Sequence, residues 1–136
     1  MKKLKHTLLL LVISFISCLS FAQTETAIKT DLENKLVQLF PDAEITKIKD
    51  LEAFKESYQL VLNEPLDHHN PKKGTFKHYI YLSHLDFNNP MVIETEGYAA
   101  RYTKTELSSL LNANQVIVEY RFYGKSRPNP IPWEYL

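Results

Sequence analysis

Two strand-like stretches with a helix-forming stretch between them most constrain the fold of this chain. Residues 91–95, MVIET, have the apolar and β-branched character of a strand that is covered on both faces. Residues 103–113 predict a helix, with Thr103 as N-cap and Glu106 three residues later, and the β-prone residues 115–124 follow. A strand–helix–strand unit implies that its two strands pair in parallel. The sequence therefore predicts an α/β fold.

Two half-buried strands precede this unit. Residues 54–62 and residues 75–85 both alternate between apolar and polar side chains, which is typical of strands with one buried face. The connection between them, residues 63–74, contains two prolines and a glycine and reads as a turn-rich loop. The two strands therefore predict an antiparallel hairpin.

An amphipathic helix is predicted before the hairpin. Residues 26–40 carry apolar side chains at spacings of three and four, and Pro41 ends the pattern. A parallel β-α-β unit needs helices on both faces of its sheet, and the sequence supplies about one for that purpose. We therefore expect an incomplete α/β domain.

The first 22 residues have the layout of a secretory signal peptide. A basic end with three lysines precedes the apolar run 8–21, and a small-residue site ends at Ala22. The run is shorter than the roughly 20 residues of a spanning helix, and no later stretch is apolar enough to cross a bilayer. The alternatives are an uncleaved anchor and lipidation at Cys18, whose preceding residues match a lipobox poorly. We expect export to the periplasm or the extracellular space.

Composition after cleavage excludes several classes of function. Cleavage reduces 16 Lys and Arg residues to 13, against 16 Asp and Glu, which gives a net charge of −3. Nothing in this balance indicates the basic face that nucleic-acid binding demands, so we expect no nucleic-acid partner. The single cysteine leaves with the leader, so the mature chain has neither a disulfide nor a thiol nucleophile. His68, His69, His78 and His84 fit no zinc spacing, and we expect turn and strand-surface histidines with no metal.

Three stretches carry a resemblance to a known family. They are NEPLDHHNPKKGTFKHYIYLSH at 63–84, VIETEGY at 92–98 and NANQVIVEYRFYGKSRPNPIPWEYL at 112–136. In this order and spacing they resemble the N-terminal part of the secreted tripeptidyl aminopeptidase family of serine peptidases. The second and third also resemble the lysosomal Pro-X carboxypeptidase group. The resemblance covers residues 58–136.

The resemblance implies an α/β-hydrolase fold and a longer chain. Members of the family carry Ser, Asp and His in that order, with the Ser on a G-x-S-x-G turn. Ser126 follows Gly124 but lacks the second glycine and precedes Arg-Pro, so we expect no nucleophile here. The predicted organisation is a signal peptide at 1–22, a helical segment at 23–53 and the N-terminal portion of a peptidase domain at 54–136. No cofactor is implied.

The loop Glu96-Gly97-Tyr98 is the main candidate site. In α/β-hydrolases the loop after the third strand donates one backbone N–H to the oxyanion hole, and the resemblance places the Tyr98 N–H in that role. Gly97 would shape the loop and let substrate approach the backbone closely. A plain strand-ending turn is the alternative. Glu96 is a candidate for binding a substrate's α-ammonium group, with a solvated carboxylate as the alternative.

Glu119 and Arg121 lie two residues apart on the last predicted strand. Such residues project on one face, near the strand end at which ligands gather in open α/β sheets. We expect an internal ion pair between them that positions the neighbouring loop.

These observations predict the N-terminal fragment of an exported serine peptidase. The intact family member would release short peptides from free N-termini through an acyl-enzyme, with peptide substrates as its partners. The fragment alone would be inactive, because Ser, Asp and His lie beyond Leu136. The alternative is a non-catalytic exported binding module.

Overall fold

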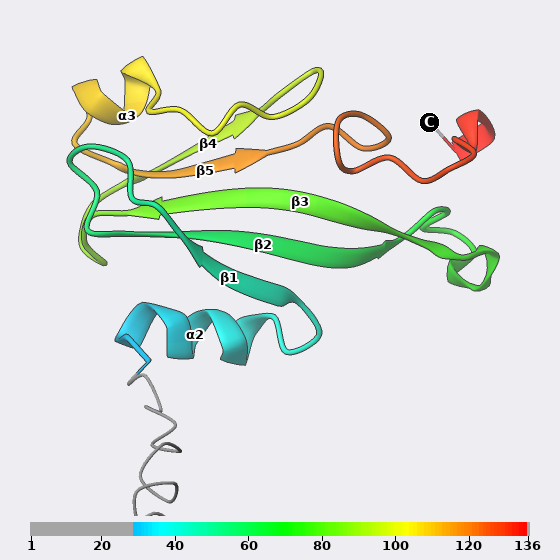
Figure 1. The fold of residues 1–136 in the computed structure, drawn as a ribbon, viewed down its shortest axis with the longest axis horizontal. Helices are drawn as coiled ribbons and strands as arrows, with labels where there is room; N and C mark the ends of the chain where they lie inside the picture. The colour runs from blue at the N-terminus through cyan, green and yellow to red at the C-terminus, as the bar shows by residue number, and fades with distance from the viewer. Residues whose placement is uncertain (1–28, 136) are drawn as a thin grey trace, which may run out of the picture. The chain divides into compact units, whose positions relative to one another are not determined.

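The computed structural model describes residues 29–135, in which five strands form one sheet in the order β1-β2-β3-β5-β4 (Figure 1). The chain divides into two units, residues 1–30 and 31–136, and the second contains every element described below. The strands are β1 Glu44–Ile48, β2 Glu56–Pro65, β3 Thr75–His84, β4 Met91–Thr95 and β5 Asn114–Val118. The helices are α2 Asp31–Leu39 and α3 Glu106–Leu110, with short 3-10 turns η1 Pro71–Lys73 and η2 Trp133–Tyr135. The predicted leader lies outside the described residues, as does the first part of the predicted helix 26–40.

The hairpin and the strand–helix–strand unit are both confirmed. β2 and β3 pair antiparallel over their full lengths, from Glu56 opposite His84 to Pro65 opposite Thr75. β4 and β5 pair in parallel, with α3 between them in the chain. β5 joins the hairpin by pairing antiparallel with β3, so the mixed α/β sheet is mostly antiparallel.

Several boundaries differ from the sequence-based expectations. β1, which pairs antiparallel with β2, lies inside the segment that was expected to be only helical. α3 is shorter than predicted, and its N-cap is Thr105, whose hydroxyl accepts a hydrogen bond from the Ser108 N–H at 3.2 Å. β5 ends at Val118, so Glu119 and Arg121 follow the strand rather than lying on it.

The strand β4 is also more exposed than its composition predicts. Met91 is 48% and Ile93 66% exposed, whereas Val92 on the opposite face is buried. The prediction of a strand covered on both faces is therefore wrong for the described chain. β4 is the last strand in the sheet order, and α2 packs on β2 and β3, so it does not cover β4.

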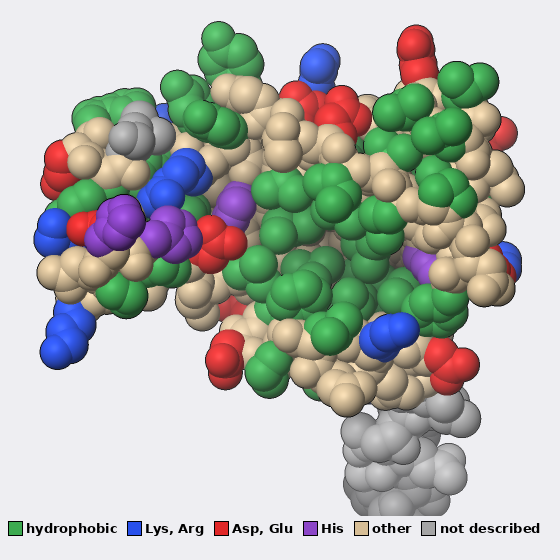
Figure 2. Space-filling model, turned by 180° about the vertical axis from the view of Figure 1, so that it is seen from behind, with side chains coloured by type: hydrophobic (Ala, Val, Ile, Leu, Met, Phe, Trp, Pro, Cys, Tyr) green, Lys and Arg blue, Asp and Glu red, His purple; other side chains and the backbone are tan. Residues whose placement is uncertain are grey.

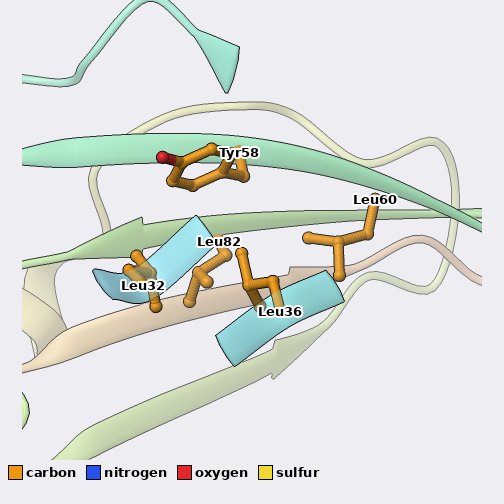
Figure 3. Close-up of a cluster of buried hydrophobic side chains, with 5 residues drawn as sticks. All are labelled: Leu32, Leu36, Tyr58, Leu60 and Leu82. Carbon is orange, nitrogen blue, oxygen red and sulfur yellow. The ribbon is translucent and has the colours of Figure 1, made fainter. Parts of the chain in front are cut away.

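The helix α2 builds the main core. Its Leu32 and Leu36 pack on Tyr58, Leu60 and Leu82 of β2 and β3, and all five side chains are buried (Figure 3). Leu32 and Leu36 are four residues apart, so they lie on one side of the helix and face the same side of the sheet. Within residues 29–135, no helix has the length and apolar character to cross a membrane.

Candidate functional site

The carboxyl ends of β4 and β5 lie side by side, because the two strands are neighbours and parallel. Two loops therefore begin at the same edge of the sheet: residues 96–102 after β4 and residues 119–126 after β5. The Glu96 N–H donates to the Val118 carbonyl at 3.1 Å, which continues the pairing one residue beyond β4. The predicted site residues 96–98 and Glu119 are brought together at this edge.

A buried carboxylate, Glu119, connects the two loops. Its Oε1 accepts a hydrogen bond from the Ala100 N–H at 3.1 Å, and its Oε2 accepts bonds from the N–H and the hydroxyl of Ser126, both at 2.7 Å. The Ser126 hydroxyl in turn accepts the Tyr79 N–H of β3 at 2.9 Å. Glu119 is 2% exposed and Ser126 is fully buried. Ser126 is therefore a structural residue in this arrangement and is not presented to a substrate.

The glycine that the site requires is Gly124. Its φ is +51°, and a Cβ added there would lie 2.0 Å from Glu119 Oε1 and 2.9 Å from the Ala99 Cβ. Phe122, in the same loop, also has a positive φ of 68°. Two residues of this loop are therefore in the left-handed conformation, and the loop folds around the Glu119 carboxylate. In the sequence, Gly124 stands two residues before Ser126, and this spacing by itself suggests a comparison with a nucleophile motif rather than contact with a buried carboxylate.

Gly97 lies in open space. A Cβ added at Gly97 would meet no atom within 4 Å, and its φ lies outside the left-handed region. No described residue therefore approaches the Gly97 backbone closely, and the close approach of substrate that we expect there stays a prediction. Glu96 is half-buried, and the N–H groups of residues 97–99 have no hydrogen-bond partner in the described part of the chain. The Tyr98 ring is 75% exposed and lies edge-on against Tyr123, with their centroids 5.7 Å apart.

Arg121 does not pair with Glu119, so the expected ion pair is wrong. Its Nη2 donates to the Leu66 carbonyl at 2.8 Å, and its guanidinium lies 4.6 Å from the ring centre of Phe122 and 5.3 Å from that of Phe76. The physical reason is that β5 ends at Val118, so the two residues do not follow strand alternation. Arg121 instead ties the loop after β5 to the end of the β2–β3 hairpin.

An ionisable pair, Glu64 with His78, lies beside Glu119. His78 Nδ1 is 3.0 Å from Glu64 Oε1, and its Nε2 is 2.6 Å from the Glu119 carbonyl oxygen. Both ring nitrogens therefore lie close to oxygen atoms, although the Nδ1 contact with Glu64 lacks hydrogen-bond geometry. The Glu64 carboxylate raises the pKa of His78, against the opposing effect of burial. His78 in turn lowers the pKa of Glu64. Nothing in the sequence pattern had singled out Glu64.

The other histidines do not form a metal site. His68 and His69 are exposed in the turn after β2, as expected, but His78 and His84 are buried rather than at the strand surface. Among residues 29–135, no three His, Cys, Asp or Glu side chains are grouped closely enough to hold a metal ion.

A hollow of about 330 Å³ opens at the carboxyl ends of β4 and β5. It is lined by Glu64, His68, His78, Thr95, Val118, Glu119, Tyr120 and Arg121. Acidic, basic and aromatic side chains thus surround this space, and residues 96–99 of the candidate loop are not among its lining residues. The lining surface is mostly apolar, and the hollow lies at the carboxyl ends of the strands, where ligands gather in open α/β sheets.

Comparison with known proteins assigns the chain to a family. Residues 27–136 match the family described as PS-10 peptidase S37. The chain is also 32% identical, over 117 residues, to a prolyl tri/tetrapeptidyl aminopeptidase of Streptomyces mobaraensis. That match covers 85% of this chain and 24% of the relative, so the chain spans about a quarter of the relative's length. These matches confirm the resemblance seen in the sequence, and the chain belongs to the PS-10 peptidase S37 family.

Proposed function

We propose that this chain forms the N-terminal part of an exported serine peptidase with an α/β-hydrolase fold. The peptidase would release tripeptides or tetrapeptides from free N-termini, as the name of the Streptomyces mobaraensis relative describes for that protein. The family match carries the proposal. The basic and apolar leader at residues 1–22 supports export.

In this proposal residues 29–135 have a structural role, and the nucleophilic serine lies in another part of the peptidase. Four of the five serines between residues 29 and 135 are buried, at positions 57, 83, 108 and 126. The fifth, Ser109, donates its hydroxyl to the Thr105 carbonyl at 3.0 Å. None of the five has a hydrogen bond to a histidine ring within this part of the chain, so the nucleophile–base pair of a serine peptidase is not formed by these residues.

The loop after β4 would contribute to the oxyanion hole. Its free N–H groups lie at the carboxyl end of a parallel strand, and Glu119 holds Ala100, two residues beyond Tyr98. Backbone donors that are fixed before the reaction stabilise the developing negative charge without reorganising. The Tyr98 N–H is the donor that we assign to this role, with Gly97 leaving the approach open.

A chimera tests the proposal. Residues 27–136 would replace the matching segment of the Streptomyces mobaraensis aminopeptidase, and release of a prolyl tripeptide from a chromogenic substrate would be measured. Tyr98→Pro removes the proposed donor and is expected to lower kcat by about 10²–10³-fold. Ala99→Pro is the matched control, because it removes the neighbouring N–H, and it should leave more than a tenth of kcat.

Two results would contradict the proposal. Equal losses of kcat in Tyr98→Pro and Ala99→Pro would remove Tyr98 from the assigned role. A chimera that is folded but inactive would show that this segment cannot serve in such a peptidase. The 136-residue chain alone should give no peptide release above a blank, with the intact Streptomyces mobaraensis enzyme as the positive control.

A further inference from the structure

Three tyrosine rings lie together beyond the carboxyl ends of β4 and β5. Tyr98 belongs to the loop after β4, whereas Tyr120 and Tyr123 belong to the loop after β5. The ring centres of Tyr98 and Tyr123 are 5.7 Å apart, and those of Tyr120 and Tyr123 are 5.6 Å apart. Both distances fall in the range of about 4.5–7 Å in which aromatic rings attract each other. We call Tyr98, Tyr120 and Tyr123 the tyrosine cluster.

The tyrosine cluster presents its rings to solvent. Tyr98 is 75% and Tyr120 is 47% exposed, and Tyr123, which lies between them, is half-buried. None of the three hydroxyl groups has a hydrogen-bond partner within residues 29–135. Tyrosine is enriched on surfaces that bind other molecules, because its ring offers an apolar face and its hydroxyl a polar group. The exposure of the cluster therefore indicates a surface for recognition.

The apolar surface beside α2 has a different composition. A hollow of about 440 Å³ there is lined mainly by Leu, Ile, Val and Met side chains, and Figure 2 shows hydrophobic side chains gathered across the middle of one face. Aliphatic side chains of this kind are typical of protein interiors. Tyrosine rings suit a ligand that stays partly in water. The cluster at the strand ends is therefore the better candidate for a ligand site.

The tyrosine cluster adjoins the backbone group that we assign to the oxyanion hole. Tyr98 carries both an exposed ring and the proposed donor N–H. A hydrogen bond of about 2.9 Å from this N–H to a carbonyl oxygen would bring the residue that owns the carbonyl within reach of the Tyr98 side chain. At the other end of the cluster, Tyr120 lines the hollow of about 330 Å³ at the strand ends. The cluster therefore extends from the proposed donor to this hollow.

We propose that the tyrosine cluster is the subsite that binds the pyrrolidine ring of a prolyl residue at the scissile bond of a peptide. This prolyl residue is the one whose carbonyl oxygen accepts the Tyr98 N–H, so it is the last residue of the released peptide. The Tyr98 ring contacts the pyrrolidine ring, and the Tyr123 ring orients Tyr98 through their edge-on contact. The inference rests on the proposed function, from which it takes the donor N–H and the peptide substrate.

The chemistry of the cluster favours a prolyl ring over other side chains. Aromatic-lined grooves bind proline-containing segments, whose extended main chain is already largely fixed before binding. A prolyl ring also loses almost no rotamer freedom when it is bound, whereas a lysyl side chain, which an aromatic face attracts as a cation, loses much more. Proline has two more carbon atoms than alanine, and each CH₂ group buried contributes about fourfold in affinity. We therefore expect a preference of about fifteenfold for a prolyl over an alanyl residue.

A comparison of substrates in the chimera tests the subsite. The value of kcat/KM would be measured for a prolyl tripeptide p-nitroanilide and for its alanyl and lysyl analogues. Tyr98→Ala removes the ring but keeps the backbone N–H, and it should lower the prolyl-to-alanyl ratio of kcat/KM by about fourfold or more. Tyr98→Phe keeps the ring and should change this ratio by less than about twofold. Tyr102→Ala is the matched control, because its ring packs on Tyr81 outside the cluster, and it should leave the ratio unchanged.

Three outcomes in an active chimera would overturn the inference and leave the proposed function standing. They are an unchanged ratio in Tyr98→Ala, an equal fall in Tyr98→Phe or Tyr102→Ala, and a higher kcat/KM for the lysyl than for the prolyl substrate. If the chimera is folded but inactive, calorimetry gives the same ratio from the Kd values of the free tripeptides that end in proline and in alanine. Tighter binding of the prolyl tripeptide that is lost in Tyr98→Ala would then support the subsite and contradict the proposed function alone. Equal binding of the two tripeptides would contradict both.

Discussion

Substituting Gly124 by alanine should destabilise the chain by about 2.5–5 kcal/mol. The left-handed φ of +51° costs about 1–2 kcal/mol for a residue with a Cβ. The new Cβ would lie 2.0 Å from Glu119 Oε1, so the carboxylate must move and lose its bond from the Ala100 N–H. A hydrogen bond to a charged group contributes about 1.5–3 kcal/mol. The sum is a large fraction of the 5–15 kcal/mol typical of a folded domain.

Urea unfolding followed by far-UV circular dichroism measures this loss as a change in the free energy of unfolding. Gly124→Asn separates its two causes, because asparagine tolerates a left-handed φ but still carries the Cβ that meets Glu119. We expect Gly124→Asn to remain destabilised by about 2–4 kcal/mol, which is the loss of the Glu119 contacts without the full backbone cost. Gly97→Ala is the matched control, with open space and an ordinary φ, and should change stability by less than about 1 kcal/mol.

The reasoning would be refuted by either of two patterns. If Gly124→Ala costs less than about 1 kcal/mol, the carboxylate is not fixed where the structure places it. If Gly124→Asn restores wild-type stability, the backbone conformation alone explains the glycine, and contact with Glu119 is irrelevant.

Two further predictions concern the core and the pH dependence of stability. Leu36→Ala should cost about 2–5 kcal/mol in urea unfolding, because Leu36 is buried in the main core, whereas Val37→Ala at the exposed neighbouring position should cost under about 1 kcal/mol. The Glu64–His78 pair should stabilise the fold most between about pH 4.5 and 6.5. The raised pKa of His78 makes its contribution full below its ordinary value of 6.5 and lost as the pH rises through the folded pKa. The lowered pKa of Glu64 makes its contribution present above its ordinary value of 4.5 and lost as the pH falls through the folded pKa. Glu64→Gln should therefore flatten the decline in unfolding free energy between pH 6 and 9, and an unchanged slope would show that the pair does not titrate with folding.

The regular elements were predictable because their signals are local. The alternation in residues 75–85 and the helical spacing before Pro41 each depend on neighbours in the chain, and both gave the right element. Exposure on β4 was not predictable in this way, since MVIET has the same composition whether a neighbouring strand and helix cover it or not. The ends of elements were also missed where long-range contacts set them, as at β5, whose following residue Glu119 turns inward to bond Ala100 and Ser126.

The candidate site was also difficult to predict, because its contacts join residues that are not neighbours in the chain. The sequence directed attention to Gly97 because it ends a strand, and to an ion pair between Glu119 and Arg121 because they are two residues apart. A glycine's necessity depends on what its missing Cβ would touch, and the residue touched at Gly124 is Glu119, five positions earlier in the chain. No pattern of residue types encodes that contact, because it requires two left-handed residues, Phe122 and Gly124, to fold the loop back on the carboxylate.

This geometry links the stability of the loop to the proposed catalysis. Glu119 holds Ala100 by one hydrogen bond, and Tyr98, the proposed oxyanion donor, lies two residues before it. A carboxylate displaced by Gly124→Ala would therefore free the loop that positions the donor. Misplacement of a catalytic group by about 1 Å can cost about 10²-fold in rate. In the chimera, Gly124→Ala should consequently lower kcat even at temperatures where the protein stays folded. Gly97→Ala leaves Glu119 in place, so it should not lower kcat by displacing the loop. Comparing kcat of the two variants therefore separates the positioning of the Tyr98 N–H from the access of substrate to it.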